Sequence, residues 1–230
     1  MAEQNLQGSY FLTLSSNRQK KLLAYVCMVT TSAESDVPKG NTYDKYESKN
    51  PVERYLMEGF FTCLNSALPT KAPENILEVG AGEGEVADVV RKRYPNANYV
   101  AIDLPSDELA GQWSERSLDG LFGNMENLPL PTASFDLVLA IEVFEHVDNP
   151  ERCLTEIKRV GSSNFVCSVP REPIWRAANM ARGKYIGDLG NTPGHINHWS
   201  SKAFEQLMAT ELTVKRTQRP FPWTMVSAHL

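Results

Sequence analysis

The run Glu78-Val79-Gly80-Ala81-Gly82-Glu83-Gly84-Glu85 constrains this chain more than any other feature of the sequence. A short apolar strand pattern, Ile76–Val79, precedes it, and a helical pattern from Val86 to Tyr94 follows. Glycines between a strand and a helix allow the backbone to approach a bound cofactor closely. A dinucleotide-binding fingerprint would place glycines at 80, 82 and 85, whereas position 85 is Glu. The spacing therefore argues against a nicotinamide-dependent dehydrogenase.

Strand and helix patterns alternate around this glycine turn. Strands of this kind, separated by helices, predict an α/β fold with a doubly wound, parallel sheet. The alternation stops over Arg171–Trp199, which we interpret as a lid insertion because long segments between elements are usually functional. Beyond the strand already named, the sequence predicts strands at 98–102, 121–122, 135–140, 164–169, 212–217 and 223–228. It also predicts helices at 50–69, 149–160 and 200–208, and Gly161 is the predicted C-cap of the second of these.

Composition and length indicate one soluble domain. The chain has 230 residues and a net charge of −5, and the acidic balance gives no support for nucleic-acid binding. Four scattered cysteines without Cys-x-x-Cys spacing predict neither a zinc site nor a disulfide framework, and we expect a cytoplasmic location. We expect no transmembrane segment, a weakly ordered arm over residues 1–40, and a single domain over 41–230. Basic residues 18–21 before apolar Leu22–Val29 leave a short signal peptide, or a true start at Met28, as alternatives.

Three landmarks in chain order make the sequence resemble a known family. The acid-x-Gly-x-Gly-x-Gly pattern at 78–84 comes first, and Asp103 ends the second strand pattern. Ile141-Glu142-Val143-Phe144-Glu145-His146-Val147 follows the fourth strand pattern. Together they resemble class I S-adenosylmethionine-dependent methyltransferases (methyltransferase type 11-like), in the small-molecule branch that is similar to ubiquinone and menaquinone biosynthesis enzymes. The resemblance covers roughly 43–230 and is strongest over 76–170.

The resemblance implies a Rossmann-like, seven-stranded sheet, mostly parallel, with one antiparallel strand near the C-terminus and helices on both faces. It implies S-adenosyl-L-methionine as cofactor, with Asp103 binding the ribose hydroxyls. Gly123–Pro129 would lie beside the adenine, although Asn124 replaces the usual Asp and loses charge assistance. The cofactor-binding candidates are Tyr43, Glu78, Gly80, Gly82, Gly84, Asp103, Leu104, Asn124, Met125 and Glu142.

Three histidines are candidate catalytic residues, and no metal is expected. His146 follows the fourth strand at the edge where ligands of α/β sheets bind, so it is a candidate base; alternatively it braces the next helix. His195 and His198 lie in the predicted lid without Cys or carboxylate at ligand spacing, which favours contact with the acceptor over metal binding. The alternative is that His198 and Trp199 pack over the following helix as a hydrophobic staple.

Arg171 and Trp199 are the candidate substrate-binding residues. Arg171 leaves the fifth strand and would bind a carboxylate or phosphate of the acceptor; the alternative is a surface pair with Glu172. Tyr43 would close over the methionine end of the cofactor, or else anchor the first helix.

The resulting prediction is methyl transfer to a small organic acceptor, with oxygen or carbon nucleophiles favoured. We expect a monomer or homodimer that binds no nucleic acid. The alternatives are methylation of a macromolecule and an inactive, methyltransferase-like binding or scaffold protein.

Overall fold

A computed structural model describes residues 50–230 of the chain. Tyr43, the predicted arm and the apolar run Leu22–Val29 lie outside the described residues. The described part begins with helix α2 (Pro51–Ala67), which Asn50 caps by accepting a hydrogen bond from the Val52 N–H. No helix within residues 50–230 is long and apolar enough to cross a lipid bilayer.

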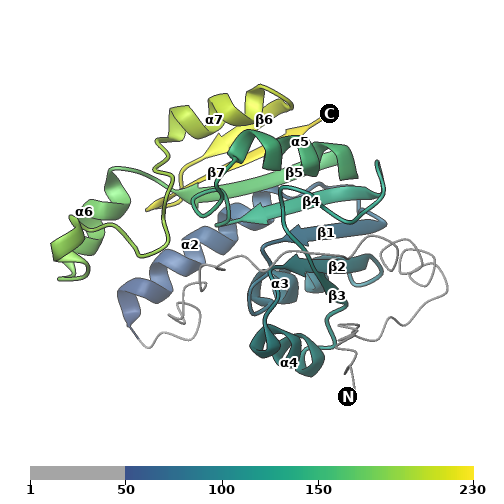
Figure 1. Ribbon diagram of the computed structural model, residues 1–230, viewed down its shortest axis with the longest axis horizontal. Coiled ribbons are helices and arrows are strands. Elements are labelled where there is room, and N and C mark those ends of the chain that lie inside the picture. Colours follow the sequence, from purple (N-terminus) through teal and green to yellow (C-terminus); the bar gives the residue numbers. More distant parts are fainter. Residues whose placement is uncertain (1–49) are drawn as a thin grey trace, which may run out of the picture.

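Seven strands form one mixed sheet in the order β3-β2-β1-β4-β5-β7-β6 (Figure 1). Strand β7 runs antiparallel to both β5 and β6, so it is the single strand opposed to the other six. The predicted doubly wound sheet with one antiparallel strand near the C-terminus is confirmed. The strands are β1 (Asn75–Val79), β2 (Asn98–Asp103), β3 (Gly120–Phe122), β4 (Phe135–Ile141), β5 (Gly161–Pro170), β6 (Thr213–Gln218) and β7 (Trp223–His229).

Two apolar clusters hold helices on opposite faces of the sheet. On one face, α5 (Pro150–Val160) and α7 (Ser201–Ala209) pack against strand residues such as Val138 and Cys167. On the other, α2, α3 (Glu85–Arg93) and α4 (Asp107–Glu115) pack against neighbours in the same strands, such as Leu137 and Val166. Successive side chains of a strand point to opposite faces, so strands buried on both faces read as continuous apolar runs.

The structure adds elements that the sequence pattern did not show. Helix α4 follows β2, with Ser106 as its N-cap. The predicted lid contains helix α6 (Ile174–Ala181) and a short 3-10 helix, Ile186–Asp188. Gly161 is the C-cap of α5, yet its φ of −79° is extended rather than left-handed, because it is also the first residue of β5. A Cβ there would approach the Phe165 ring to 2.5 Å, which accounts for glycine at this position.

Candidate functional site

The glycine turn lies where the strand order reverses. Strand β1 has β2 on one side and β4 on the other, so the loops after β1 and β4 flank the switch point where α/β sheets bind ligands. Gly80, Gly82 and Gly84 all have positive φ, at +72°, +50° and +92°. A Cβ at Gly82 would meet nothing within 4 Å, so the space beside this residue is open to a ligand. A Cβ at Gly80 would instead lie 2.3 Å from Val143 Cγ2, so this glycine lets the β4 loop pack on the turn.

Asp103 is bonded directly to the glycine turn. Its Oδ2 accepts a 2.7 Å hydrogen bond from the Gly82 N–H, and its Oδ1 accepts one of 2.7 Å from the Leu104 N–H. Burial raises the pKa of Asp103, while these backbone donors and nearby His146 act in the lowering direction. Each carboxylate oxygen has a second lone pair, so both can still accept from ligand hydroxyls. The arrangement therefore suits a vicinal diol beside Gly82.

Glu78 is the buried acid of the turn. It lies on β1 and is 1% exposed, and the Tyr99 hydroxyl on β2 donates a 2.6 Å hydrogen bond to its Oε2. Burial raises the pKa of Glu78 from its ordinary value of 4.5 to about 8, with Asp103 and Asp88 adding to the increase. At neutral pH this side chain is therefore mostly protonated. Its predicted contact with the cofactor stays a prediction.

The segment after β3 supplies a polar backbone beside Asp103. The Gly123 N–H donates to the Asp103 carbonyl oxygen at 2.8 Å. Asn124 Oδ1 accepts from the Glu126 N–H at 2.8 Å and so closes a local turn. The Met125 side chain is buried in the core cluster that also contains Val79 of β1 and Ile102 of β2. The adenine contacts predicted for Asn124 and Met125 stay predictions.

The loop after β4 begins with a strained residue. Glu142 has a φ of +60°, which is uncommon for a non-glycine residue and clusters at functional sites. Its Oε1 accepts a 2.9 Å hydrogen bond from the Ser168 hydroxyl on β5. Its N–H donates to the Ser168 carbonyl oxygen at 3.0 Å. These bonds hold the loop across the ends of β4 and β5.

His146 and His195 lie together in the structure. Their ring centroids are 4.9 Å apart in an edge-to-face arrangement, and the buried Glu145 places Oε1 4.0 Å from His146 Nε2. Ligand atoms of these three residues all lie within 4.8 Å of one another, which is compatible with a metal ion. The sequence places no carboxylate at ligand spacing from the lid histidines, yet folding brings Glu145 to His195; the expectation of no metal stays a prediction.

Hydrogen bonds to the β4 loop anchor the second half of the predicted lid. The Glu145 carbonyl oxygen accepts from the Ile196 and Asn197 N–H groups at 2.9 and 3.0 Å. The Asn197 amide donates to the carbonyl oxygens of Phe144 and Val147, at 3.1 and 2.6 Å. These contacts carry His195 to the edge of the sheet. His146 Nδ1 lies 2.8 Å from the Gly194 carbonyl oxygen, which can only accept, so Nδ1 carries the proton.

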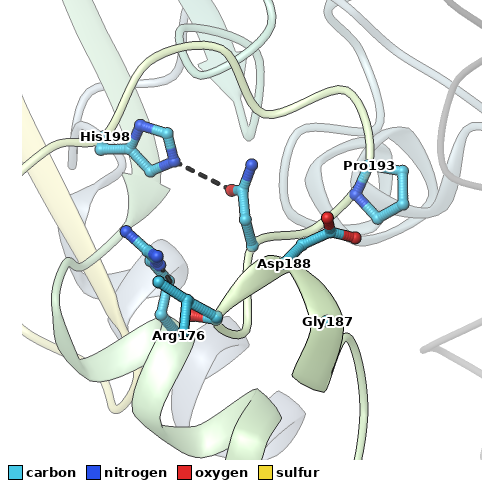
Figure 2. Close-up of a pocket in the computed structure, with 7 residues that line it drawn as sticks. Arg176, Gly187, Asp188, Pro193 and His198 are labelled. Carbon is cyan, nitrogen blue, oxygen red and sulfur yellow. Dashed lines mark hydrogen bonds between the residues drawn. The ribbon is translucent and has the colours of Figure 1, made fainter.

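His198 lies apart from the other two histidines. It is exposed and lines a cavity of about 590 Å³ with Arg176, Asp188, Asn191 and Pro193. Figure 2 shows Arg176 and His198 on one side of this cavity and Pro193 on the other. His198 Nε2 donates a 2.9 Å hydrogen bond to Asn191 Oδ1. The structure does not bring His198 to His146 or Asp103, and its predicted catalytic role stays a prediction.

The two predicted substrate-binding residues differ in their surroundings. Trp199 packs against Phe204 at 5.9 Å between ring centroids and donates from Nε1 to the Phe144 carbonyl oxygen at 3.2 Å. Since Ser200 caps α7, Trp199 and Phe204 form a hydrophobic staple, which is the alternative to contact between Trp199 and the acceptor. Arg171 forms no ion pair with Glu172 within residues 50–230, and its buried Nε has no hydrogen-bond partner there.

Sequence reasoning missed three residues that shape the site. Tyr99 bonds Glu78, Trp175 stacks over His195 at 6.1 Å between ring centroids, and Trp223 lies 5.8 Å from Trp175. Only Tyr99 carried a local signal, as a polar-tipped aromatic in an apolar strand. The tryptophans meet through contacts between β7 and the predicted lid.

The chain resembles known methyltransferases in sequence and in fold. The family model described as "Methyltransferase domain" matches residues 77–166. Ajmaline N-methyltransferase of Rauvolfia serpentina is 32% identical over 101 residues, covering 41% of this chain and 35% of that protein. Malonyl-[acyl-carrier protein] O-methyltransferase of Geobacter sulfurreducens is 32% identical over 123 residues, covering 51% of this chain and 44% of that protein. The chain thus spans less than half the length of these relatives.

A solved structure shows the same fold. The S-adenosylmethionine-dependent methyltransferase of Aquifex aeolicus matches with a TM-score of 0.60 at 18% identity, covering 78% of this chain and 93% of that one. The matched residues 77–166 include the glycine turn, Asp103 and the loop after β4. Residues 77–166 thus match the methyltransferase domain family, and the sheet has the fold of the S-adenosylmethionine-dependent methyltransferase of Aquifex aeolicus.

Proposed function

We propose that this protein transfers a methyl group from S-adenosyl-L-methionine to a small organic acceptor, with an oxygen or carbon nucleophile favoured. The observation that carries the proposal is that Asp103 Oδ2 accepts a hydrogen bond from the Gly82 N–H, while the position of a Cβ on Gly82 is open space. A ribose diol requires such an acid with lone pairs to spare, and the domain match covers both residues. Asn124 and Met125 would border the adenine.

The sulfonium of the cofactor supplies an already activated methyl group. The chain then has to align the acceptor in line with that methyl and exclude water. The segment from Asn191 to Trp199 closes this side of the domain through its bonds to the β4 loop. We assign residues 171–199 the role of an acceptor-facing lid over a single domain.

His146 is the candidate base. Its Nδ1–H donates to the Gly194 carbonyl oxygen, so Nε2 of the neutral ring keeps a lone pair that can accept a proton. Glu145 Oε1 lies 4.0 Å from Nε2, so its carboxylate would stabilise the imidazolium that forms. Three free thiols at Cys63, Cys153 and Cys167 support a reducing, cytoplasmic location for this enzyme.

Isothermal titration with S-adenosylmethionine, S-adenosylhomocysteine and NAD tests the cofactor assignment. We expect both adenosyl ligands to bind and NAD not to bind. A screen of small hydroxyl-, carbon-, nitrogen- and sulfur-containing acceptors should then release S-adenosylhomocysteine. Binding of the adenosyl ligands without turnover on any acceptor would favour a scaffold instead, and absence of adenosyl binding would refute the proposal.

A further inference from the structure

A mainly apolar cavity lies beside the predicted lid, separate from the glycine turn. It has a volume of about 330 Å³ and lies between the first half of α2, helix α6 and the turn before β7. Figure 1 shows α6 beside α2 at the end of the sheet where β5 leads into the lid segment. Pockets of this size are large enough for a small organic ligand. Its apolar walls include Leu56, Met57, Trp175, Ala178, Phe221 and Trp223.

The wall of this cavity contains a buried donor without an acceptor. Trp223 is 4% exposed, and its Nε1 has no hydrogen-bond partner within residues 50–230. The other three tryptophans of the chain each donate: Trp113 to the Gly82 carbonyl oxygen, Trp175 to Thr192 Oγ1 and Trp199 to the Phe144 carbonyl oxygen. Buried polar groups are normally hydrogen-bonded, so an exception in a cavity wall points to a ligand oxygen.

A second buried donor without a partner belongs to Arg171, whose backbone lies beside the Pro222–Trp223 part of the cavity wall. Arg171 follows Pro170, the register partner of Trp223, and its N–H donates to the carbonyl oxygen of Pro222, which lines the cavity. The Arg171 Nε is buried without a hydrogen-bond partner, and its guanidinium has no ion pair in the described part of the chain. By contrast, the cavity's Glu53 is already paired with Arg182 at 3.5 Å. Among the charged residues that line the cavity, Glu53 is outnumbered by Arg182 and Lys184, so the lining carries a net positive charge.

Trp175 connects the cavity to the histidines. Its ring lines the cavity and stacks over His195, whose ring contacts that of His146. A ligand in the cavity therefore lies next to the edge at which we place methyl transfer. An apolar wall, the unmatched Trp223 Nε1 and the unpaired Arg171 guanidinium together match an apolar carboxylic acid.

We propose that this cavity binds the apolar body of an anionic acceptor, whose carboxylate accepts from Trp223 Nε1 and Arg171. The inference rests on the proposed function and names its substrate class. Binding of the acid is separable from binding of the cofactor, because the cavity contains neither the glycine turn nor Asp103.

Decanoate is the probe, with decylammonium as a ligand of the same chain length and opposite charge. Titration of the full-length protein should show decanoate binding at least tenfold tighter than decylammonium. Saturating S-adenosylhomocysteine should not displace decanoate, because an acceptor subsite must be occupied together with the cofactor. Equal affinity for the two probes, no decanoate binding, or competition with S-adenosylhomocysteine would overturn the inference. Absence of S-adenosylhomocysteine binding would instead count against the proposed function.

Two neighbouring positions on α6 provide a matched pair of variants. Ala178 lines the cavity, whereas Ala177 is exposed and does not. Ala178→Trp should weaken decanoate binding at least tenfold, and Ala177→Trp should leave it unchanged; both should bind S-adenosylhomocysteine as the parent does. Arg171→Gln should weaken decanoate at least fivefold and leave decanol binding unchanged. Equal decanoate affinities in the two tryptophan variants would place the acid elsewhere.

Discussion

The rings of His146 and His195 meet edge to face at 4.9 Å between centroids, although the first follows β4 and the second lies in the segment before α7. The Gly194 carbonyl oxygen fixes the proton of His146 on Nδ1. The β4 loop and the lid thus form one unit around His146 Nε2.

Replacement of His146 by Ala should lower kcat by about 10²- to 10⁴-fold with an oxygen acceptor, the usual contribution of a positioned general base. Steady-state rates at saturating S-adenosylmethionine measure this effect. His198→Ala should cost far less, because His198 faces a different cavity and donates to Asn191. Equal losses in the two variants would contradict His146 as the base.

Asp103→Ala should weaken S-adenosylmethionine binding by roughly 1–3 kcal/mol, the cost of losing charged hydrogen bonds. The substitution also removes the acceptor of the Gly82 N–H. Isothermal titration measures the change, and Glu108→Ala, an exposed acid on nearby α4, is the control for net charge. Unchanged affinity in Asp103→Ala would mean that the ribose binds elsewhere.

Gly82→Ala should mainly weaken cofactor binding, whereas Gly80→Ala should mainly lower the stability of the fold. At Gly82 the Cβ enters open space, so the only cost to stability is the strain of a left-handed alanine, roughly 1–2 kcal/mol. Cofactor binding should fall because the Cβ occupies the space that the cofactor approaches. At Gly80 the Cβ would clash with Val143, so the larger effect should be on stability. Urea unfolding and titration with S-adenosylhomocysteine separate the two outcomes. Full binding by Gly82→Ala would show that the cofactor does not approach this residue.

Glu78→Gln should reduce the dependence of stability on pH. The folded-state pKa of Glu78 is raised to about 8 by burial, so the unfolded chain loses this proton at lower pH than the folded chain does. The free energy of unfolding contributed by Glu78 is therefore fully present below about pH 4.5 and is lost as pH rises through about 8.

Urea unfolding of both proteins between about pH 5 and pH 8 measures this difference. Asp103 and Glu172 also have raised pKa values, so they too make stability fall as pH rises. Because both proteins retain these two groups, subtracting the unfolding free energy of the variant from that of the parent isolates the contribution of Glu78. A parallel fall in both proteins would show that Glu78 ionises normally in the folded state.

The alternation of elements was readable from the sequence because its causes are local. Buried parallel strands appear as apolar runs, and Asn50-Pro51 and Asn149-Pro150 mark helix starts through a side-chain cap and a proline that needs no N–H donor. Helix α4 was missed because its apolar contact is made mainly by Trp113, which gives little periodicity. Helix α6 was missed for a similar reason, since small residues occupy much of it.

By itself, the sequence determined the doubly wound sheet, the glycine turn and the acid at the end of β2, since short-range patterns specify each of them. Only the tertiary structure decided that His195 joins His146 and Glu145 while His198 does not. Only it showed that Trp199 packs on Phe204 as a hydrophobic staple, that Trp223 lies unmatched in a cavity wall, and that the Arg171 Nε is buried without a partner. These outcomes depend on how the lid docks on the sheet, and contacts between residues far apart in the chain leave no periodic trace in it.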